Sequence, residues 1–479
     1  MAGVRRLLPV VITGLLIVAA LAPVTIPRRL QREAAAAELV SVSLRVPILG
    51  EPTQPVDAID TPMLRAHRSP EWMVWPVLDR RLAAELDALV ASWPEPYCLT
   101  VSVDGRPIYS TGTAPQIPAS VQKIVTAAAV LTHMDAEARL VTRVVTEGVV
   151  VDGVVGGDVY VIGGGDPLLT TEPYADAYSR QPQLRTPIED LADRIAAAGI
   201  TRINGRLIGD ESRHDEIRYV ETWPDRYRAQ HNSGPLSALT VNDGFTRWTP
   251  SRVDSSQPAL HFVDVLRALL SERGVTVANG TSTGVASETA TLVTEIESPT
   301  VGEMVSQMLR ESDNNTAEVL LKELGLLISG QPSTAAGADV AATTVAALLP
   351  GLNPPVVFDG SGLDRANQVS CPFLVGLLDH FGPDSVLGSG LAVAAESGTL
   401  GHRFTETELA GILHAKTGLL NSVNGLAGYI DRPDGGQIAF AQLLNGVPLT
   451  GRLGIDIQEE LVFALARHLE PLNPEVFAP

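Results

Sequence analysis

Lysine is nearly absent from this chain. Of the 35 Lys and Arg residues only Lys123, Lys322 and Lys416 are lysine, so arginine supplies almost all of the positive charge. With 55 Asp and Glu residues the formal net charge is −20, which argues against a nucleic-acid-binding surface, because binding phosphates needs clustered Lys and Arg. Arginine cannot serve as a base, since its guanidinium stays protonated. The rare lysines therefore indicate positions at which a proton must be lost.

Clustered metal ligands are also missing. The nine histidines are scattered, with no His-Glu-x-x-His or Cys-x-x-Cys segment, so we predict no metal and no cofactor. The chain has only two cysteines, Cys98 and Cys371. They allow a single disulfide, which export would permit, but two buried thiols are slightly favoured.

The N-terminal part predicts export. An apolar run over residues 7–26 follows Arg5 and Arg6, and its length suits either a signal peptide or one membrane anchor. We assign residues 1–30 to this segment, and both alternatives place the protein in the cell envelope or periplasmic space, secreted or anchored. Residues 31–80, rich in Ala, Pro and charge, predict a tether.

Local patterns predict several elements after the tether. Residues 80–93 predict an amphipathic helix, and the runs 97–103 and 106–110, on either side of Asp104-Gly105, predict a β-hairpin. Strands are expected at 238–242 and at 412–418, where the strand enters Lys416. Thr300-x-x-Glu303 has the form of a capping box and predicts the start of a helix. A second helix from about residue 315 would leave Ser312-Asp313-Asn314 on the connection between the two.

A helix beginning at Ser120 is the most informative stretch. It has good helix formers, no Gly or Pro through Leu131, and apolar residues around most of its surface, which predicts a core helix. Positions three apart share a helical face, so Ser120 and Lys123 meet at the first turn. A serine hydroxyl becomes nucleophilic when a neighbouring base takes its proton, and a lysine can do so when its pKa is lowered.

Three short motifs follow one another along the chain. They are Ser120-x-x-Lys123, Ser312-Asp313-Asn314 and Lys416-Thr417-Gly418. The middle triplet alone also fits an ordinary helix cap, since Ser, Asp and Asn are common N-cap residues. Together the three motifs resemble the penicillin-recognising serine enzymes. Further segments narrow the resemblance: Gly163-Gly164-Gly165-Asp166-Pro167, Gly234-Pro235-Leu236-Ser237-Ala238-Leu239, Asp359-Gly360-Ser361-Gly362-Leu363 and Gly398-Thr399-Leu400.

With the long separation of the first two motifs, these segments resemble the D-alanyl-D-alanine carboxypeptidase/endopeptidase family of low-molecular-mass penicillin-binding proteins, class C. The resemblance covers about residue 84 to the C-terminus. It implies an α/β (α+β) fold with a β-lactamase/transpeptidase-like catalytic domain, whose central antiparallel sheet is flanked by helices. We expect the catalytic domain at 81–138 and 259–479, interrupted by a β-rich insertion at 139–258. We expect the insertion to make none of the catalytic bonds and to shape access for large substrates.

The resemblance also implies roles in acyl transfer. Ser120 would attack the substrate with Lys123 as base, Ser312 would relay a proton to the departing D-alanine, and Asn314 would hold the substrate's backbone amide. The implied substrates are peptidoglycan peptides ending in D-Ala-D-Ala, and β-lactam antibiotics would bind at the same site.

The third motif would bind the terminal carboxylate. Lys416 would place positive potential in the site and, with Thr417, hold that carboxylate, while Gly418 would let substrate approach the strand. The oxyanion would lie between the backbone N–H groups of Ser120 and Leu419. Leu419 departs from the family, which often has Ser or Thr there, so a side-chain hydroxyl contact would be missing.

Two other functions share parts of this pattern. A class A β-lactamase has the same three motifs, but it needs a Glu-x-x-Leu-Asn segment, which is absent between Asn314 and Lys416. A catalytically silent envelope-binding protein would keep the scaffold without the chemistry. The intact set of serine, lysine and asparagine side chains argues against it.

Overall fold

The computed structural model describes residues 71–177, 184–446 and 452–468. The expected export segment, and the tether up to residue 70, lie outside these residues. Within them, no helix combines the length and apolar character needed to cross a bilayer. A helix predicted from Arg80 begins earlier, because α3 covers Glu71–Val90.

A six-stranded antiparallel sheet forms the centre of the catalytic part, as the resemblance implied. Its strand order is β16-β17-β18-β19-β1-β2. The strands are β1 (Tyr97–Val103), β2 (Arg106–Thr111), β16 (Ala392–Val393), β17 (Leu413–Leu420), β18 (Val423–Asp431) and β19 (Gln437–Asn445). The predicted hairpin between β1 and β2 is confirmed, with Asp104 and Gly105 both at positive φ, 51° and 72°, as its tight turn requires.

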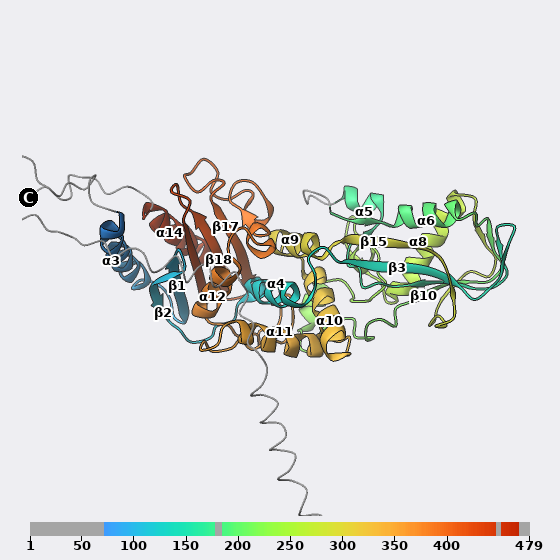
Figure 1. Ribbon diagram of the computed structural model, residues 1–479, viewed down its shortest axis with the longest axis horizontal. Coiled ribbons are helices and arrows are strands. Elements are labelled where there is room, and N and C mark those ends of the chain that lie inside the picture. The colour runs from blue at the N-terminus through green and yellow to red at the C-terminus, as the bar shows by residue number, and fades with distance from the viewer. Residues whose placement is uncertain (1–70, 178–183, 447–451, 469–479) are drawn as a thin grey trace, which may run out of the picture. The chain divides into compact units, whose positions relative to one another are not determined.

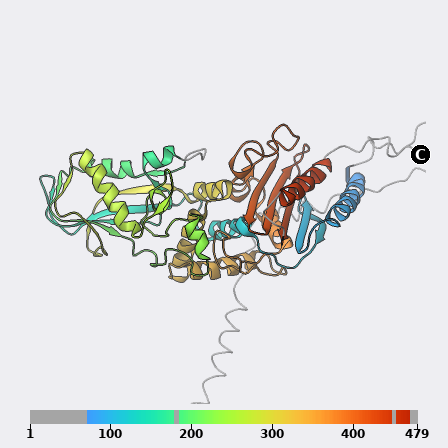
Figure 2. The ribbon, with the colours of Figure 1, turned by 180° about the vertical axis from the view of Figure 1, so that it is seen from behind.

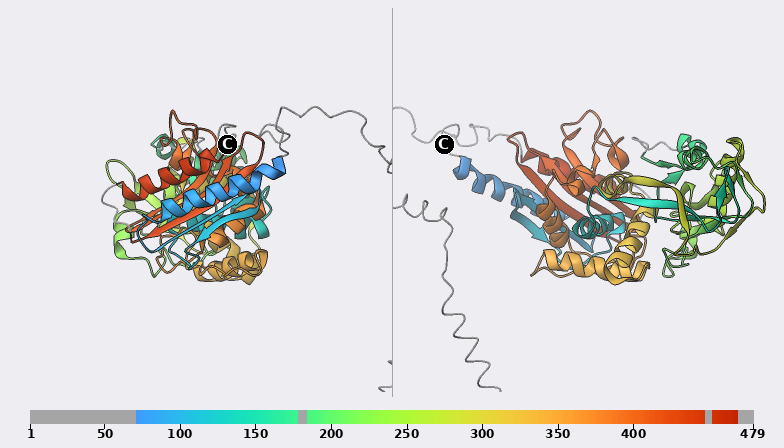
Figure 3. Two further views of the ribbon diagram at one scale, coloured as in Figure 1. Left: turned by 90° about the vertical axis from the view of Figure 1, so that its left-hand side faces the viewer. Right: turned by 45° about the vertical axis from the view of Figure 1, so that its right-hand side comes forward.

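Helices cover both faces of this sheet. On one face α3 and α14 (Leu453–Arg467) lie side by side, as Figures 2 and 3 show. The other helices of the catalytic part are α4 (Gln122–His133), α9 (Val301–Glu311), α10 (Asn314–Ser329), α11 (Thr334–Leu348), α12 (Cys371–Phe381) and α13 (Val386–Ser389). The predicted capping box at Thr300 and Glu303 is present and begins α9.

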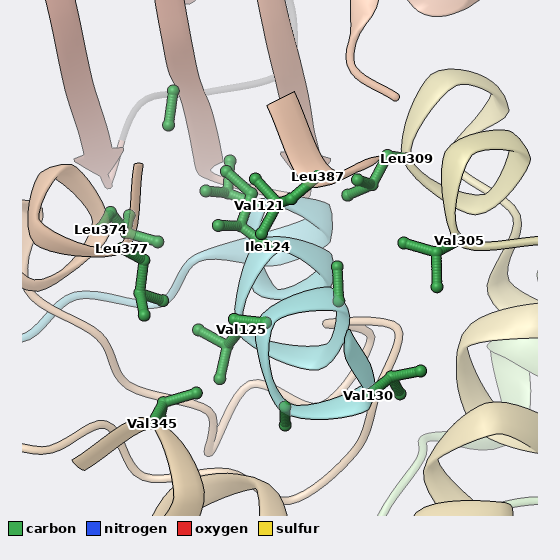
Figure 4. Packing of buried hydrophobic residues seen from close by; sticks show 14 of the residues in the cluster. Val121, Ile124, Val125, Val130, Val305, Leu309, Val345, Leu374, Leu377 and Leu387 are labelled. Atoms are coloured by element: carbon green, nitrogen blue, oxygen red, sulfur yellow. The ribbon is translucent and has the colours of Figure 1, made fainter. Parts of the chain in front are cut away.

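Strand alternation sends side chains into two separate cores. On β18, Leu426 and Ile430 pack in the core beneath α3 and α14, whereas Ala427 and Tyr429 face the core around α4, as the two-residue period of a strand requires. Figure 4 shows α4 at the centre of that second core, with Ile124 and Val125 pointing into it. The prediction of a core helix is confirmed.

The inserted part has its own sheets and core. Its largest sheet has five strands in the order β14-β10-β6-β3-β15, and a second has the order β13-β9-β5-β4. The strands are β3 (Arg139–Thr146), β4 (Val150–Val151), β5 (Val154–Val155), β6 (Val159–Ile162), β7 (Leu169–Thr170), β8 (Thr186–Pro187), β9 (Arg202–Ile203), β10 (Leu207–Asp210), β11 (Phe245–Arg247), β12 (Val253–Asp254), β13 (Thr276–Val277), β14 (Thr281–Thr283) and β15 (Thr291–Thr300). The helices are α5 (Glu172–Asp176), α6 (Ile188–Ala197), α7 (Asp225–Ala229) and α8 (Pro258–Glu272).

The insertion continues past the expected boundary at residue 258. Phe262, Leu266 and Ile296 are buried in the same core as Val144, and β15 pairs with β3 along most of its length. Figure 1 shows α8, β3 and β15 together. The boundary was wrong because β15 returns from the insertion to pair with its first strand before α9 begins. A strand expected at 238–242 is also absent, and a short 3-10 turn at Asn242–Gly244 follows instead.

The structure forms the disulfide that the sequence left open. Cys98 on β1 and Cys371 at the start of α12 are joined, with Cα atoms 5.8 Å apart, so the favoured reading of two free thiols was wrong. The bridge ties the central sheet to a helix across 273 residues of sequence.

Replacing both cysteines by alanine should lower the free energy of unfolding by about 2–4 kcal/mol, because the unfolded chain regains the freedom that a long closed loop removes. Urea unfolding of the two proteins, each with and without reductant, measures this. Equal stability of the unaltered protein in oxidising and reducing buffer would contradict the bridge.

Candidate active site

The turn that carries Ser120 is pressed against the central sheet. Residues Ala119–Val121 form a 3-10 turn, η2, directly before α4, and Ala119 has a positive φ of 49°. Gly418 on β17 lies so close that an added Cβ would be 2.6 Å from the carbonyl oxygen of Pro118. The absence of a side chain at Gly418 therefore lets the third motif reach the turn that holds the first.

Lys123 lies within hydrogen-bonding distance of Ser120, as the three-residue spacing predicted. Its Nζ is 3.1 Å from Ser120 Oγ and also donates to Asn314 Oδ1 and to the Ser361 carbonyl oxygen, each at 2.7 Å. The Lys123 side chain is fully buried. Three acceptors therefore fix the direction of one amine, and one of them is the candidate nucleophile.

Burial sets the charge state of the two site lysines. It lowers the pKa of Lys123 to about 8, although the negative charges of Asp359, Glu318 and Asp313 act in the opposite direction. Burial lowers the pKa of Lys416 well below its ordinary value, and the charge of Lys123 lowers it further. Two like charges this close oppose each other's protonation. The structure thus brings Lys416 to Lys123 and gives the site an amine that can lose its proton near neutral pH.

Ser312-Asp313-Asn314 connects two helices, as predicted. Ser312 ends α9 in a left-handed conformation with φ 59°, and the Asp313 side chain caps α10 by accepting from the Thr316 backbone N–H at 3.1 Å. The capping interpretation is therefore correct for Asp313. Ser312 and Asn314 line a cavity of about 110 Å³ together with residues of the insertion, and Asn314 also accepts from Lys123, so the triplet both caps a helix and reaches Lys123.

Two buried carboxylates lie behind Lys123. Glu318 on α10 accepts from the backbone N–H groups of Gly360 and Ser361, at 3.0 and 2.8 Å. Asp359 accepts from the Gly362 N–H at 2.8 Å. Burial raises the pKa of both, that of Glu318 to about 8, and the charge of Asp359 adds to the shift at Glu318. These carboxylates hold the loop that presents the Ser361 carbonyl to Lys123.

The insertion contacts a candidate site residue. Asn314 Nδ2 donates to the carbonyl oxygen of Asn232 at 2.6 Å. Asn232 follows α7, within the insertion. The residue types do not predict this contact, because every residue has a backbone carbonyl that can accept.

The third motif contributes its remaining residues at the edge of the site. Thr417 Oγ1 is 2.9 Å from Thr399 Oγ1, which belongs to the Gly398-Thr399-Leu400 segment. Leu419 is 57% exposed and offers no hydroxyl. Lys416 Nζ donates to the Thr417 carbonyl at 2.9 Å. The strand therefore presents one buried amine and one accessible hydroxyl.

Sequence reasoning missed four groups at the site. Glu318 and Asn232 stand in no recognised motif, while Asp359 and Ser361 lie in the quoted Asp-Gly-Ser-Gly-Leu segment without an assigned role. That segment was the available signal for the last two. Lys322, by contrast, forms an ion pair with Asp215, a role that arginine can also fill. The rarity of lysine therefore points to candidate site residues at two of the three lysines.

Comparison with known proteins agrees with the motifs. The family model described as D-Ala-D-Ala carboxypeptidase 3 (S13) family matches residues 98–252 and 247–468. Carboxypeptidase DacB of Mycolicibacterium smegmatis is 30% identical over 370 residues, 75% of this chain and 78% of the relative. D-alanyl-D-alanine carboxypeptidase of Actinomadura sp. is 26% identical over 451 residues, 78% of this chain and 81% of the relative.

A solved structure shows the same fold. Penicillin binding protein 4 from Haemophilus influenzae superimposes with a TM-score of 0.68 and 18% identity, covering 79% of this chain and 98% of that one. The predicted catalytic fold, with its antiparallel sheet flanked by helices, is thereby confirmed. Since the family model covers most of the chain and the relatives match over most of their length, this chain belongs to the D-Ala-D-Ala carboxypeptidase 3 (S13) family.

Proposed function

We propose that the chain is a serine D-Ala-D-Ala carboxypeptidase/endopeptidase that acts on peptidoglycan stem peptides through an acyl-enzyme on Ser120. The observation that carries the proposal is the buried contact of 3.1 Å between Lys123 Nζ and Ser120 Oγ, in a chain of this family. The same acylation makes β-lactams inhibitors. Export through the segment at residues 7–26 would place the enzyme in the cell envelope, where its substrate lies.

Acylation follows from the positions of these groups. Lys123 Nζ takes the hydroxyl proton as Ser120 Oγ attacks the carbonyl carbon of the penultimate D-Ala. The tetrahedral oxyanion is stabilised by the backbone N–H groups of Ser120 and Leu419. The C–N bond then breaks, the leaving nitrogen gains a proton through Ser312, and water later hydrolyses the ester on Ser120.

Lys416 and Asn314 bind the substrate in this proposal. The terminal carboxylate lies against Lys416 and Thr417, and its negative charge favours the protonated form of Lys416. A protonated Lys416 in turn disfavours a proton on Lys123. Substrate binding thereby helps to prepare the base that acylation requires.

The test is to incubate the purified chain with a peptide ending in D-Ala-D-Ala and, separately, with a fluorescent penicillin. Release of D-Ala together with a lasting penicilloyl adduct supports the carboxypeptidase. Rapid hydrolysis of penicillin would instead identify a β-lactamase. A chain that gives neither D-Ala nor an adduct would be a silent binding protein.

Replacing Lys416 should separate its two roles. Lys416→Ala should acylate about thirtyfold more slowly, the equivalent of about 2 kcal/mol, because one charge-assisted hydrogen bond to the carboxylate is lost. Loss of the Lys416 amine should also raise the pKa of Lys123, since a neighbouring positive charge no longer opposes protonation of Lys123. The acid limb of the acylation rate should therefore move to higher pH.

Lys416→Arg is the matched variant, since it retains a positive charge, and it should keep much of the rate. Both variants are measured with one β-lactam across pH. A profile of unchanged shape for Lys416→Ala would leave carboxylate binding as its only role, and an unchanged rate would remove Lys416 from the site.

A further inference from the structure

A segment of the insertion, residues 222–232, packs on the catalytic turn. Trp223 and Tyr227 are buried in one apolar cluster with Ala119, the residue before Ser120, and with Leu363 and Leu420. The segment contains the short helix α7. It therefore contacts the region around both Ser120 and the loop at residues 359–364.

Its first polar contact orients the side chain of Asn314. A carbonyl oxygen can only accept, so the Asn232 carbonyl requires the NH₂ group of the Asn314 amide on its side, at 2.6 Å. The opposite end of that amide, Oδ1, is then the atom that accepts from Lys123 Nζ.

The position of the Asn232 carbonyl is itself fixed. The Asn232 N–H donates to the Tyr227 carbonyl at 3.0 Å. The preceding residue, His231, is left-handed, with φ 51°, and its Nδ1 is 2.7 Å from Asp254 Oδ1.

Its second polar contact holds the loop that carries the other acceptor. Trp223 Nε1 donates to Asp359 Oδ2 at 2.8 Å, and the same oxygen accepts from the Asp364 backbone N–H at 2.6 Å. Thr222 adds a hydrogen bond to the Asp364 side chain. Between Asp359 and Asp364 lies Ser361, whose carbonyl accepts from Lys123 Nζ.

We propose that residues 222–232 are a positioning element of the catalytic site. The segment orients two of the three acceptors of Lys123, Asn314 Oδ1 and the Ser361 carbonyl, so that the amine points at the third, Ser120 Oγ. This rests on the proposed function only in taking Lys123 as the base of acylation. The insertion then acts on the chemistry itself, in addition to any effect on access.

The charges around Lys123 give this role a signature in pH. Lys123 faces Lys416 from β17, Glu318 from α10 and Asp313 at the N-cap of α10, and Asp359 from the loop before α12. Burial raises the pKa of Asp359, and the hydrogen bond from Trp223 opposes that rise. Without the indole N–H, Asp359 is protonated more often, less negative charge faces Lys123, and the pKa of Lys123 falls. The acid limb of acylation should then move to lower pH.

Trp223→Phe tests this contact, because phenylalanine keeps an aromatic ring in the apolar cluster and removes only the N–H donor. We expect the second-order rate of acylation by benzylpenicillin to fall about tenfold, as for loss of a hydrogen bond to a charged group, and its acid limb to move to lower pH. Trp248→Phe is the control. Trp248 also belongs to the insertion, but its ring packs on Tyr174. The acylation rate of Trp248→Phe and its acid limb should therefore stay unchanged.

His231→Gly tests the other contact. Glycine accepts the left-handed backbone but loses the bond to Asp254, so the Asn232 carbonyl is less firmly held. Acylation should slow, but the acid limb of its pH–rate profile should not shift, because Asn314 carries no charge. Thermal unfolding confirms that each variant is folded.

Two results would overturn the proposal. One is that folded Trp223→Phe and His231→Gly variants keep the acylation rate and the acid limb of the unaltered chain. The other is that Trp223→Phe and Trp248→Phe lose acylation rate equally. Failure of the proposed function would look different, since the unaltered chain would then form no adduct.

Discussion

Ser120→Ala should abolish covalent labelling by penicillin and the release of D-Ala. The hydroxyl is the only group of the site that the proposed chemistry uses to form a bond to the substrate, and alanine removes that single oxygen. The small size of the change should leave η2 and α4 in place, since Ala119 and Val121 on either side are fully buried and unaltered. Loss of the nucleophile in serine hydrolases of other folds reduces turnover by about 10⁶-fold.

Intact-mass spectrometry measures the result directly. The unaltered chain should gain the mass of one penicillin, and peptide mapping should place the adduct on Ser120. Ser361 is a suitable control, because its hydroxyl is buried and lies 3.5 Å from Asp359 Oδ2, and Ser361→Ala should still be labelled. An adduct that persists in Ser120→Ala would refute the assignment of the nucleophile.

Lys123→Arg should be nearly as damaging as Lys123→Ala. Arginine keeps the charge and can donate to the same three acceptors, but it cannot give up a proton at the pH of the reaction. General-base catalysis contributes about 10²–10⁴-fold, so we expect both variants to acylate roughly a thousandfold more slowly. In the unaltered chain the rate should rise with pH through about 8, since the amine acts as a base only above its pKa.

Lys322→Arg is the matched control for this exchange. Lys322 is also a buried lysine, but it forms an ion pair with Asp215, which arginine can preserve, so acylation should stay close to that of the unaltered chain. Rates from the loss of free penicillin, measured between pH 5 and 10, compare the three variants. Near-normal acylation by Lys123→Arg would reduce Lys123 to a structural charge.

The sequence by itself determined the catalytic elements, because local patterns encode them. The helix after Ser120, the hairpin around Asp104, the capping box at Thr300 and the strand that enters Lys416 all depend on residues near one another in the chain. The meeting of Ser120 and Lys123 follows from helical spacing alone. The order of the three motifs then indicated the family.

The tertiary structure alone decided what surrounds Lys123. Asn232 and Asn314 are 82 residues apart, and Trp223 and Asp359 are 136 apart, so no periodicity links either pair. One of these contacts ends on a backbone carbonyl, which every residue type possesses. The end of the insertion and the Cys98–Cys371 bridge were likewise decided by long-range packing. Which distant groups meet depends on how whole sheets and helices pack, and that packing sets the burial that lowers the pKa of Lys123.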